Sequence, residues 1–308
     1  VKITYIHYRR THSVVLLFLL IGNIMSQLIV NADDFGLHPA VNEAIIKGHR
    51  EGIISSTSLL ASGPAFDQAV SLAGENPSLG IGVHTCLVGG LPPVAPVDQV
   101  RSLVTEEGLF PLTYIELMKK MYSGTLNYNE VYIELKAQFD KVCQSGLTIT
   151  HADGHQHMHM LPKILPIVVA LMKDRGLHKI RIPQEAKAFT NGVHNPGRLV
   201  GKIGLSYVAA GARKRIEAWY MTAPDHFWGM INGGQLTQDA LEPILHRVAQ
   251  EDGVHEIMIH PGSDNQALGQ LFQWGYHWEE EEAAMTSART RLILEEKGIE
   301  LINYGDLP

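Results

Sequence analysis

The 308-residue sequence predicts an α/β fold in which about seven mainly parallel strands form a sheet covered by helices. Two observations support this prediction. From residue 28 onward, short apolar segments alternate with longer segments whose apolar residues recur at helical spacing. The short segments have too few polar positions for either face of a sheet to meet water, which is typical of buried parallel strands. The number of strands favours a barrel or a barrel-like sheet.

The individual elements follow from these apolar patterns and from the glycines that end helices. In the first helix, Val41, Ala44 and Ile45 have the spacing of a buried helical face. Gly146 and Gly176 are expected to end two later helices, because glycine is common just after a helix. In chain order we expect strand 28–30, helix 40–51, strand 56–60, helix 66–73, strand 79–84, helix 128–145, strand 147–151, helix 161–175, strand 179–182, helix 238–249, strand 256–259, helix 279–297 and strand 300–303.

Residues 188–235 interrupt the alternation of strands and helices. This stretch contains many glycines among scattered aromatic residues and has no apolar period that could form a core of its own. We therefore expect a single domain over 26–308, in which 188–235 is an insert that forms an elaborated crossover or a lid.

The first 25 residues are set apart from this domain. Arg9 and Arg10 precede an apolar run, 14–21, which is shorter than the roughly 18 residues that a membrane span requires. The residues from Met25 onward have the character of a natural N-terminus, so 1–25 is interpreted as an extension from a start assigned too early. The alternative is a signal-like segment, although no small-residue cleavage site follows. A cytoplasmic protein is expected, with export as the alternative.

Composition excludes several classes of function. The 25 basic and 32 acidic side chains leave a net charge of −7, which gives no reason to expect a nucleic acid or an anionic membrane as partner. Two cysteines cannot build a disulfide framework or an all-cysteine zinc site. Any metal would therefore be held mainly by carboxylates and by some of the 16 histidines.

Side chains suited to metal binding and proton transfer follow four of the predicted strands. In parallel α/β folds the carboxyl ends of the strands meet at one edge, where sites form. Taken alone, the adjacent aspartates Asp33 and Asp34 would also fit a turn or a helix cap, and a single histidine at a strand end would fit a structural role. Their coincidence at one edge favours a site. The residues are Asp33 and Asp34 after the first strand, His84 at the end of the third, His151, Asp153, His155, His157 and His159 around the end of the fourth, and His260 after the sixth.

The histidines of 151–159 are crowded too closely for a mostly apolar chain unless they share a cation or hydrogen-bond partners. Imidazole and carboxylate ligands suit Zn, Mn, Fe, Co or Ni better than Ca, and suit Mg if water completes its coordination. Not all of these histidines can bind one ion, so some should orient ligands or face substrate. Because Asp33 and Asp34 are adjacent, alternation directs their carboxylates apart, so one could bind metal while the other moves a proton.

At these residues the sequence resembles the YdjC-like carbohydrate deacetylases, which include chitooligosaccharide and hopanoid-associated deacetylases. The matching stretches are 28–36, 82–84, 151–162 and 259–262. The resemblance implies a distorted (β/α) barrel and a metal-dependent hydrolase that removes an acetyl group from an N-acetylated amino sugar. The loop at 223–229 is more similar to the hopanoid-associated branch, so the substrate is expected to be a small carbohydrate or a glycolipid.

The resemblance also implies roles for individual residues. Asp34, His84 and His155 would bind one divalent ion, with Mg or Zn preferred and Mn, Co, Fe or Ni as alternatives. Asp33 would be the general base and His260 the general acid. Asp153 and Arg181 match positions that would orient the catalytic residues. The resemblance assigns no ligand role to His157 and His159, which we expect to contact substrate or to orient the ligands because they follow the same strand as His155.

Other interpretations stay open at this point. A sugar- or metal-binding protein without turnover would need neither proton carrier, and another metal-dependent barrel hydrolase or isomerase would also gather histidines and carboxylates at strand ends. A homodimer is compatible with the sequence. The aromatic residues of the insert either stack on a sugar or pack the insert itself; they are Trp219, Tyr220, Phe227 and Trp228.

Overall fold

A computed structural model describes residues 26–308 except 187 and 194, so the predicted extension at 1–25 lies outside the described residues. The described part contains a parallel seven-stranded sheet with the strand order β4-β3-β2-β1-β6-β5, and β7 pairs with the first residues of β1. This confirms the predicted α/β class. The strands are β1 (Gln27–Phe35), β2 (Ser56–Leu59), β3 (Gly80–Thr85), β4 (Ile149–Gly154), β5 (His226–Trp228), β6 (Val254–Ile259) and β7 (Glu300–Leu301).

The sheet curls until its two edges are linked, which confirms the distorted barrel. Ala152 of β4 forms a parallel bridge with Ile180, and Lys179 forms another with Thr222, shortly before β5. The predicted strand 179–182 is thus reduced to bridging residues. The strand β5 was not predicted, because three residues are too few to show a pattern. It pairs with β6, so part of the predicted insert belongs to the sheet itself.

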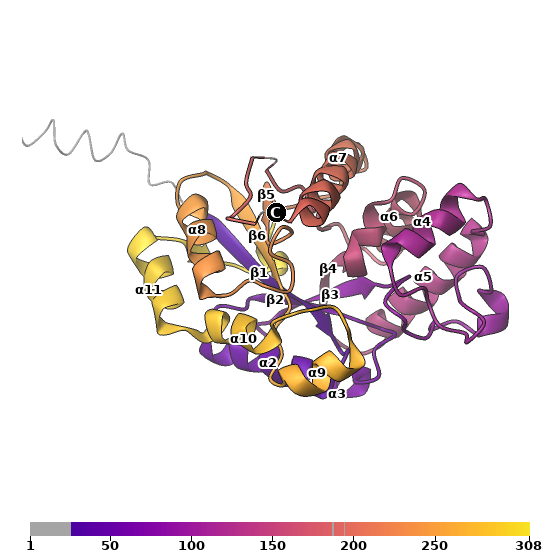
Figure 1. The fold of residues 1–308 in the computed structure, drawn as a ribbon, viewed down its shortest axis with the longest axis horizontal. Helices are drawn as coiled ribbons and strands as arrows, with labels where there is room; N and C mark the ends of the chain where they lie inside the picture. Colours follow the sequence, from indigo (N-terminus) through magenta and orange to yellow (C-terminus); the bar gives the residue numbers. More distant parts are fainter. Residues whose placement is uncertain (1–25, 187, 194) are drawn as a thin grey trace, which may run out of the picture.

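Helices surround this sheet (Figure 1), with α2 and α3 below it in that view, α5 and α6 to the right, and α8 and α11 to the left. The helices predicted at 40–51, 66–73, 128–145 and 238–249 are confirmed within a few residues. The described helices are α2 (Pro39–Glu51), α3 (Phe66–Gly74), α4 (Tyr114–Tyr122), α5 (Tyr128–Cys143), α6 (Leu165–Lys173), α7 (Pro196–Ala218), α8 (Gln238–Val248), α9 (Asn265–Leu271), α10 (Trp278–Thr286) and α11 (Ala288–Lys297).

Several helix predictions were wrong for identifiable reasons. The helix predicted from 161 begins only at Leu165, because Leu161 precedes a proline and is extended, with ψ 135°. The single helix predicted at 279–297 breaks at Ser287, whose side chain caps α11 by accepting a hydrogen bond from the backbone of Arg289. The helices α4 and α9 were missed.

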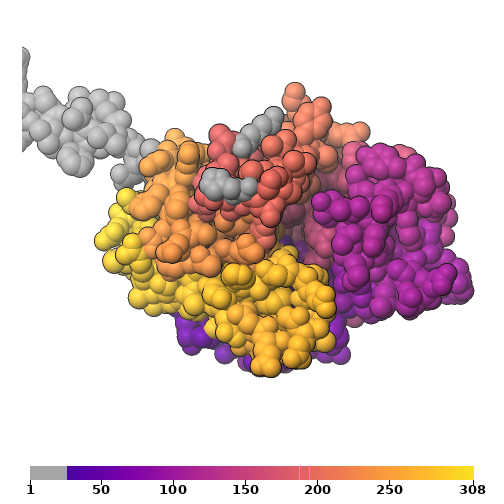
Figure 2. Space-filling view, in the orientation of Figure 1, coloured from indigo at the N-terminus to yellow at the C-terminus, as the bar shows by residue number. Residues whose placement is uncertain are grey.

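The 23-residue helix α7 was also missed, inside the predicted insert. Its glycines suggested irregular chain, but three of them, Gly201, Gly204 and Gly211, border open space and cost the helix only propensity. None of the helices in the described part is long and apolar enough to cross a membrane. In the space-filling view α7 lies above a recess between the magenta residues near α4 and the gold residues around α9 and α10 (Figure 2).

The two faces of the strands serve different purposes. In β1, Leu28, Val30 and Ala32 belong to the large apolar core, whereas Ile29 packs with the C-terminal segment around Tyr304. Because side chains alternate along a strand, Asn31 and Asp33 lie on the same face of β1 as Ile29, and this face is the inside of the barrel. The C-terminal segment therefore closes one end of the barrel, and the opposite end carries the polar strand ends.

Gly82 in β3 leaves room for a buried histidine ring. A Cβ at this position would lie 2.4 Å from Nε2 of His151, whose ring is 0% exposed. We expect Gly82→Ala to lower the free energy of unfolding by about 1–3 kcal/mol, the usual cost of overpacking a core. The matched control is Gly74→Ala in α3, where a Cβ meets no atom within 4 Å. Urea denaturation of both variants measures the difference, and equal stabilities would contradict the close packing.

Candidate functional site

Parallel pairing brings the polar strand ends to one edge of the sheet. Ala32 of β1 is in register with Ile259 of β6, and His84 of β3 is in register with Asp153 of β4. Residues that follow these positions, including Asp33 and His260, therefore lie along the same edge. The four predicted polar strand ends, those of β1, β3, β4 and β6, thus lie at one edge of the sheet.

A bulge in β1 presents both adjacent carboxylates to the site. Between Ala32 and Phe35 the strand has one more residue than the facing part of β2, and Asp34 has φ 67°. This left-handed conformation is uncommon for a residue other than glycine, and bulges often redirect side chains beside active sites. Asp33 and Asp34 each lie within 4.8 Å of a nitrogen of His84. The alternation expected for a regular strand is replaced by two carboxylates that approach one imidazole.

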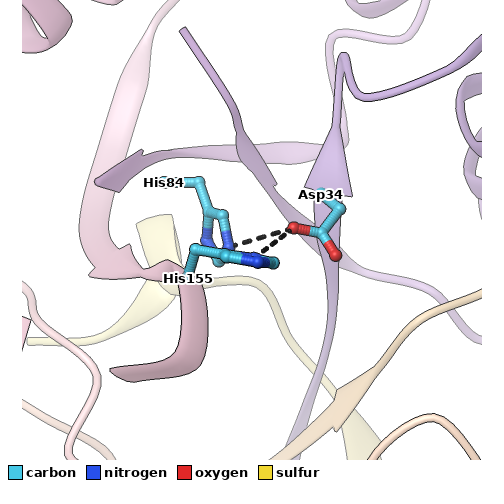
Figure 3. A group of neighbouring side chains, drawn as sticks. All are labelled: Asp34, His84 and His155. Carbon is cyan, nitrogen blue, oxygen red and sulfur yellow. Dashed lines mark hydrogen bonds and ion pairs between the residues drawn. The ribbon is translucent and has the colours of Figure 1, made fainter. Parts of the chain in front are cut away.

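Asp34, His84 and His155, called here the Asp34 group, come together from three chain segments (Figure 3). Asp34 Oδ1 lies 2.9 Å from His155 Nδ1 and 3.3 Å from His84 Nε2. One ligand atom from each residue lies within 4.8 Å of the other two, and all three side chains are buried. Two imidazoles and one carboxylate are ligands that Zn²⁺ and related divalent ions accept.

The surroundings of His84 fit a bound cation. Its Nδ1 lies 2.8 Å from Asp153 Oδ1, which fixes the ring and directs Nε2 toward Asp34. A carboxylate behind the far nitrogen of a histidine is the usual arrangement at metal sites. Within the described part of the chain, the buried Nε2 has a contact with Asp34 but no well-oriented hydrogen bond. That nitrogen is therefore available to an ion.

The potential at the Asp34 group favours positive charge. Burial opposes the charged form of His84, but the Asp153 and Asp34 carboxylates outweigh it and raise the pKa of His84 to about 10. Burial likewise opposes ionisation of Asp34, but His155 and His84 hold the pKa of its carboxyl well below its usual range. Surroundings that stabilise a cationic imidazole also stabilise a metal cation in its place.

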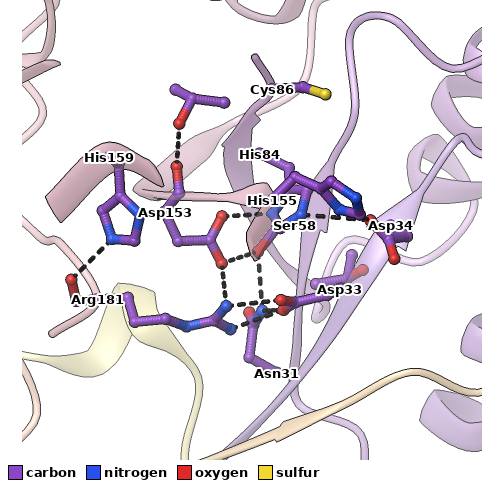
Figure 4. Close-up of polar contacts among 12 residues, drawn as sticks. Asn31, Asp33, Asp34, Ser58, His84, Cys86, Asp153, His155, His159 and Arg181 are labelled. Carbon is purple, nitrogen blue, oxygen red and sulfur yellow. Dashed lines mark hydrogen bonds and ion pairs between the residues drawn. The ribbon is translucent and has the colours of Figure 1, made fainter. Parts of the chain in front are cut away.

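Arg181 holds Asp33 in a buried ionic network (Figure 4). Its Nη1 and Nη2 each donate to one oxygen of Asp33 at 2.7 Å, in bidentate geometry. Nη1 also lies 2.9 Å from Asp153 Oδ2, and Nε donates to Glu256 at 2.7 Å. Asn31 donates to Asp33 Oδ1 at 3.0 Å. Among the described residues, Asp33 Oδ2 therefore accepts from Arg181 only and keeps a lone pair for a further proton donor.

Glu256 and Tyr304 support Arg181 from inside the barrel. The Tyr304 hydroxyl donates to Glu256 Oε2 at 2.6 Å, and its ring stacks on His151 with a centroid separation of 3.7 Å. Burial raises the pKa of Glu256 to about 7, although Arg181 and the Tyr304 hydroxyl oppose the shift. The position of Asp33 thus depends on contacts that reach the C-terminal segment.

We expect Tyr304→Phe to lower the free energy of unfolding by about 1–3 kcal/mol, because it removes a donor from a buried carboxyl group. The hydroxyl stabilises the ionised form of Glu256, so the loss should grow as the pH rises through about 7. Urea denaturation at pH 5 and pH 8 measures it. The control Tyr220→Phe alters a side chain that is 86% exposed and should change stability by less than about 0.5 kcal/mol. A Tyr304→Phe protein as stable as wild type at pH 8 would rule out this role.

The histidines that recur at every second residue do not line one face. After β4 the chain enters a 3₁₀ turn, η2 (His155–Met160), in which Gln156 and His157 have φ of 49° and 59°. This left-handed turn directs His155 toward the Asp34 group and His157 elsewhere. The His157 ring packs edge-on against Phe227, with centroids 5.7 Å apart.

His159 and His151 also lie outside the Asp34 group. His159 Nε2 lies 3.1 Å from the backbone oxygen of Arg181, so His159 helps to fix the segment that carries the guanidinium. Burial lowers the pKa of His159 to about 4 and that of His151 to about 3, which keeps both imidazoles neutral at pH 7. The predicted histidine cluster therefore divides into one member of the Asp34 group and neighbours with structural contacts.

His260 directly follows β6, at the same edge as Asp33. Its backbone N–H donates to Glu281 at 2.5 Å, and its ring packs beside Tyr276 with centroids 4.8 Å apart. Its buried Nδ1 has no hydrogen-bond partner within the described part of the chain. No described hydrogen bond or ion pair joins His260 to the Asp34 group, so its proposed role depends on a substrate between them.

Sequence reasoning missed residues that support the site. Ser58 donates to Asp153 Oδ2 at 2.6 Å, and Glu256 pairs with Arg181. Both lie in strands predicted to be buried, and a polar residue in such a strand was a usable signal. Tyr304 gave no such signal, because an aromatic residue near a chain end is compatible with simple packing.

The four aromatic residues of the predicted insert that were considered as sugar contacts are either packed into the protein or exposed to solvent. Phe227 and Trp228 are each 2% exposed and pack inside the protein, and Tyr220 is 86% exposed. Trp219 is partly buried against the core. In contrast, Trp274, outside the insert, lies with its ring centroid 5.2 Å from that of His155.

Comparison with known proteins supports the relation suggested by the motifs. The family model described as "YdjC-like protein" matches residues 27–296. A carbohydrate deacetylase of Brevibacillus brevis is 30% identical over 282 residues, which cover 91% of this chain and 99% of that protein. A carbohydrate deacetylase of Vibrio parahaemolyticus is 30% identical over 281 residues, which cover 91% of this chain and 96% of that protein.

A solved structure extends the similarity to the fold. A protein of Enterococcus faecalis V583, described as a candidate cellobiose-phosphate cleavage protein, aligns with a TM-score of 0.71 and 29% sequence identity. The alignment covers 91% of this chain and 98% of that one.

Proposed function

Because the chain belongs to the YdjC-like family, we propose that it is a metal-dependent deacetylase that releases acetate and a free amine from an N-acetylated amino sugar. The two relatives named carbohydrate deacetylase are similar to this chain along nearly their whole length, which supports deacetylation of an acetylated sugar. The substrate we propose is a chitooligosaccharide or an aminosugar glycolipid.

One observation carries the proposal: the Asp34 group lies beside a carboxylate that is held by a buried arginine. Simple binding of a metal requires the Asp34 group alone. A second carboxylate, Asp33, is positioned next to it with one lone pair available. That pairing of a cation site with a fixed proton acceptor is what amide hydrolysis by water requires.

The Asp34 group would hold the divalent ion, with Zn or Mg preferred. When bound, such an ion lowers the pKa of water and polarises the acyl carbonyl, which makes a poor electrophile reactive at neutral pH. Asp153 would keep the His84 ring oriented, because its carboxylate contacts Nδ1.

Asp33 would accept the proton of the attacking water at Oδ2. Its carboxylate is fixed by Arg181, so the acceptor needs no reorientation during the reaction. His260 would donate a proton to the departing amine nitrogen as the C–N bond breaks. Without that donor, the tetrahedral intermediate would expel water more readily than an amine.

The test is an assay that measures acetate and free amine together. The metal-reconstituted protein is incubated with N-acetylglucosamine, its β-1,4-linked oligomers and an N-acetylglucosaminyl lipid. We expect equal amounts of the two products from at least one substrate. Tight binding of a sugar with neither product would favour a binding protein without turnover and reject the proposal.

A further inference from the structure

We propose that three aromatic side chains between α9 and α10 form the sugar-binding wall of the site. These residues, Phe272, Trp274 and Tyr276, are called here the aromatic row. Trp274 stacks on the sugar that loses its acetyl group, and Phe272 stacks on a second, linked sugar. The inference rests on the proposed deacetylase function and specifies its substrate: a short oligosaccharide rather than a monosaccharide.

The aromatic row lies in the loop that joins α9 to α10. Its residues occupy alternate positions, are half-buried, and alternate with exposed neighbours. The ring centroids of Phe272 and Trp274 are 4.8 Å apart, and those of Trp274 and Tyr276 are 5.5 Å apart. The next aromatic residue, Trp278, is only 3% exposed and anchors the start of α10. Three rings thus form a continuous partly exposed surface.

This surface runs along the candidate catalytic residues. The Trp274 ring lies 5.2 Å from the His155 ring of the Asp34 group, and the Tyr276 ring lies 4.8 Å from the ring of His260. In Figure 1 the loop that carries the row passes in front of β2 and β3. A sugar whose acetyl group reaches the Asp34 group would therefore lie beside Trp274, and the next ring of the row, Phe272, is 4.8 Å from Trp274.

Two glycines show that the row is formed before substrate arrives. Tyr276 packs flat on Gly234, where a Cβ would lie 2.1 Å from the ring, and the His277 N–H donates to the Gly234 oxygen at 2.7 Å. Gly89, with φ 98°, faces the contact between the middle ring, Trp274, and His155: a Cβ there would lie 3.0 Å from His155 Nε2 and 4.0 Å from Trp274. A preformed wall loses little side-chain entropy when a ligand binds.

The chemistry of the row suits a chain of sugars. A pyranose ring presents C–H bonds on its faces and hydroxyls on its edges, so stacking on an aromatic ring removes apolar surface from water while the hydroxyls stay accessible. An apolar wall with a few polar groups at one end is typical of small-molecule sites. Since one pyranose covers about one aromatic ring, the outer ring of Phe272 is available to a second sugar.

The experiment compares kcat/KM for acetate release from N-acetylglucosamine and its β-1,4-linked dimer and trimer. For Phe272→Ala we expect a loss of about tenfold or more on the dimer and trimer and less than about twofold on the monomer, because only the outer contact is removed. Trp274→Ala should lose activity on all three, and Trp274→Phe should retain most of it. The matched control is Leu271→Ala, a neighbouring apolar side chain that is 62% exposed and lies outside the row.

Circular dichroism melting of each variant shows whether it folds, and Trp274→Phe supplies the conservative comparison. If wild type releases acetate but Phe272→Ala lowers kcat/KM equally for monomer and dimer, the second sugar position is wrong although the deacetylase function stands. If octyl N-acetylglucosaminide is as good a substrate as the dimer and its kcat/KM depends equally on Phe272, the outer ring holds an apolar chain and the inference is overturned.

If wild type releases no acetate, the proposed function fails. In that case, calorimetry compares binding of the trimer by wild type and by Phe272→Ala. Weaker binding by Phe272→Ala would support the sugar-binding wall, and equal binding would reject it.

Discussion

Asp33→Asn is expected to lower kcat for acetate release by about 10²–10⁴-fold, the range in which a positioned general base contributes. The amide that replaces the carboxylate cannot accept the proton of the attacking water. Arg181 keeps its contacts with Asp153 and Glu256, so the network loses one partner without collapsing. Steady-state kinetics with an N-acetylated sugar measure the change, which should fall on kcat much more than on KM.

The matched control is Asp67→Asn in the first turn of α3, an exposed aspartate with no hydrogen bond or ion pair to the described site residues, which should leave kcat within about twofold. Metal content must be measured for both variants, because Asp33 lies close to the Asp34 group. An Asp33→Asn enzyme with normal metal content and most of its activity would show that another group is the base.

His84→Ala should weaken metal binding by at least about 100-fold, since even the partners behind metal ligands contribute 10–100-fold. The variant loses one of three ligand atoms and leaves the Asp153 carboxylate without its imidazole partner. Acetate release should fall with metal content. Titration of stripped protein with Zn²⁺, followed by elemental analysis after gel filtration, measures the affinity directly and does not depend on activity.

Two further variants show whether the loss of metal binding is specific to the ligand His84. His246→Ala changes an exposed histidine of α8 and should bind metal like wild type. Asp153→Asn keeps all three ligands but weakens the orientation of His84, so we expect a loss of about 10–100-fold, smaller than that of His84→Ala. If His84→Ala binds Zn²⁺ as tightly as wild type, the Asp34 group is not the metal site.

The main fold could be predicted because buried parallel strands are short, apolar and separated by helices. The regions that were not predicted have local patterns that tertiary contacts override. In α7 the glycines lower helix propensity, yet the helix forms, with Ala209, Ala212 and Ile216 packed into the core. The β5 strand is too short for any periodicity and exists because β6 offers an edge for pairing.

The site could be predicted as a set of residues but not as an arrangement. Strand ends indicated which residues meet, whereas the bulge at Asp34 and the left-handed turn at His157 depend on backbone conformations that sequence periodicity does not encode. The histidines at every second residue looked equivalent, and the turn makes them different. The aromatic row was missed because Trp274 approaches His155 from a segment more than a hundred residues away.

The most direct test of the central claim, that the Asp34 group is a metal centre, is an anomalous-difference map from crystals of the wild-type protein grown with Zn²⁺. A single strong peak is predicted at about 2.0–2.2 Å from one oxygen of Asp34 and one nitrogen each of His84 and His155, the usual zinc distances. A peak that His84 does not contact, or a map with no peak at this edge of the sheet, would contradict the metal centre and the mechanism built on it.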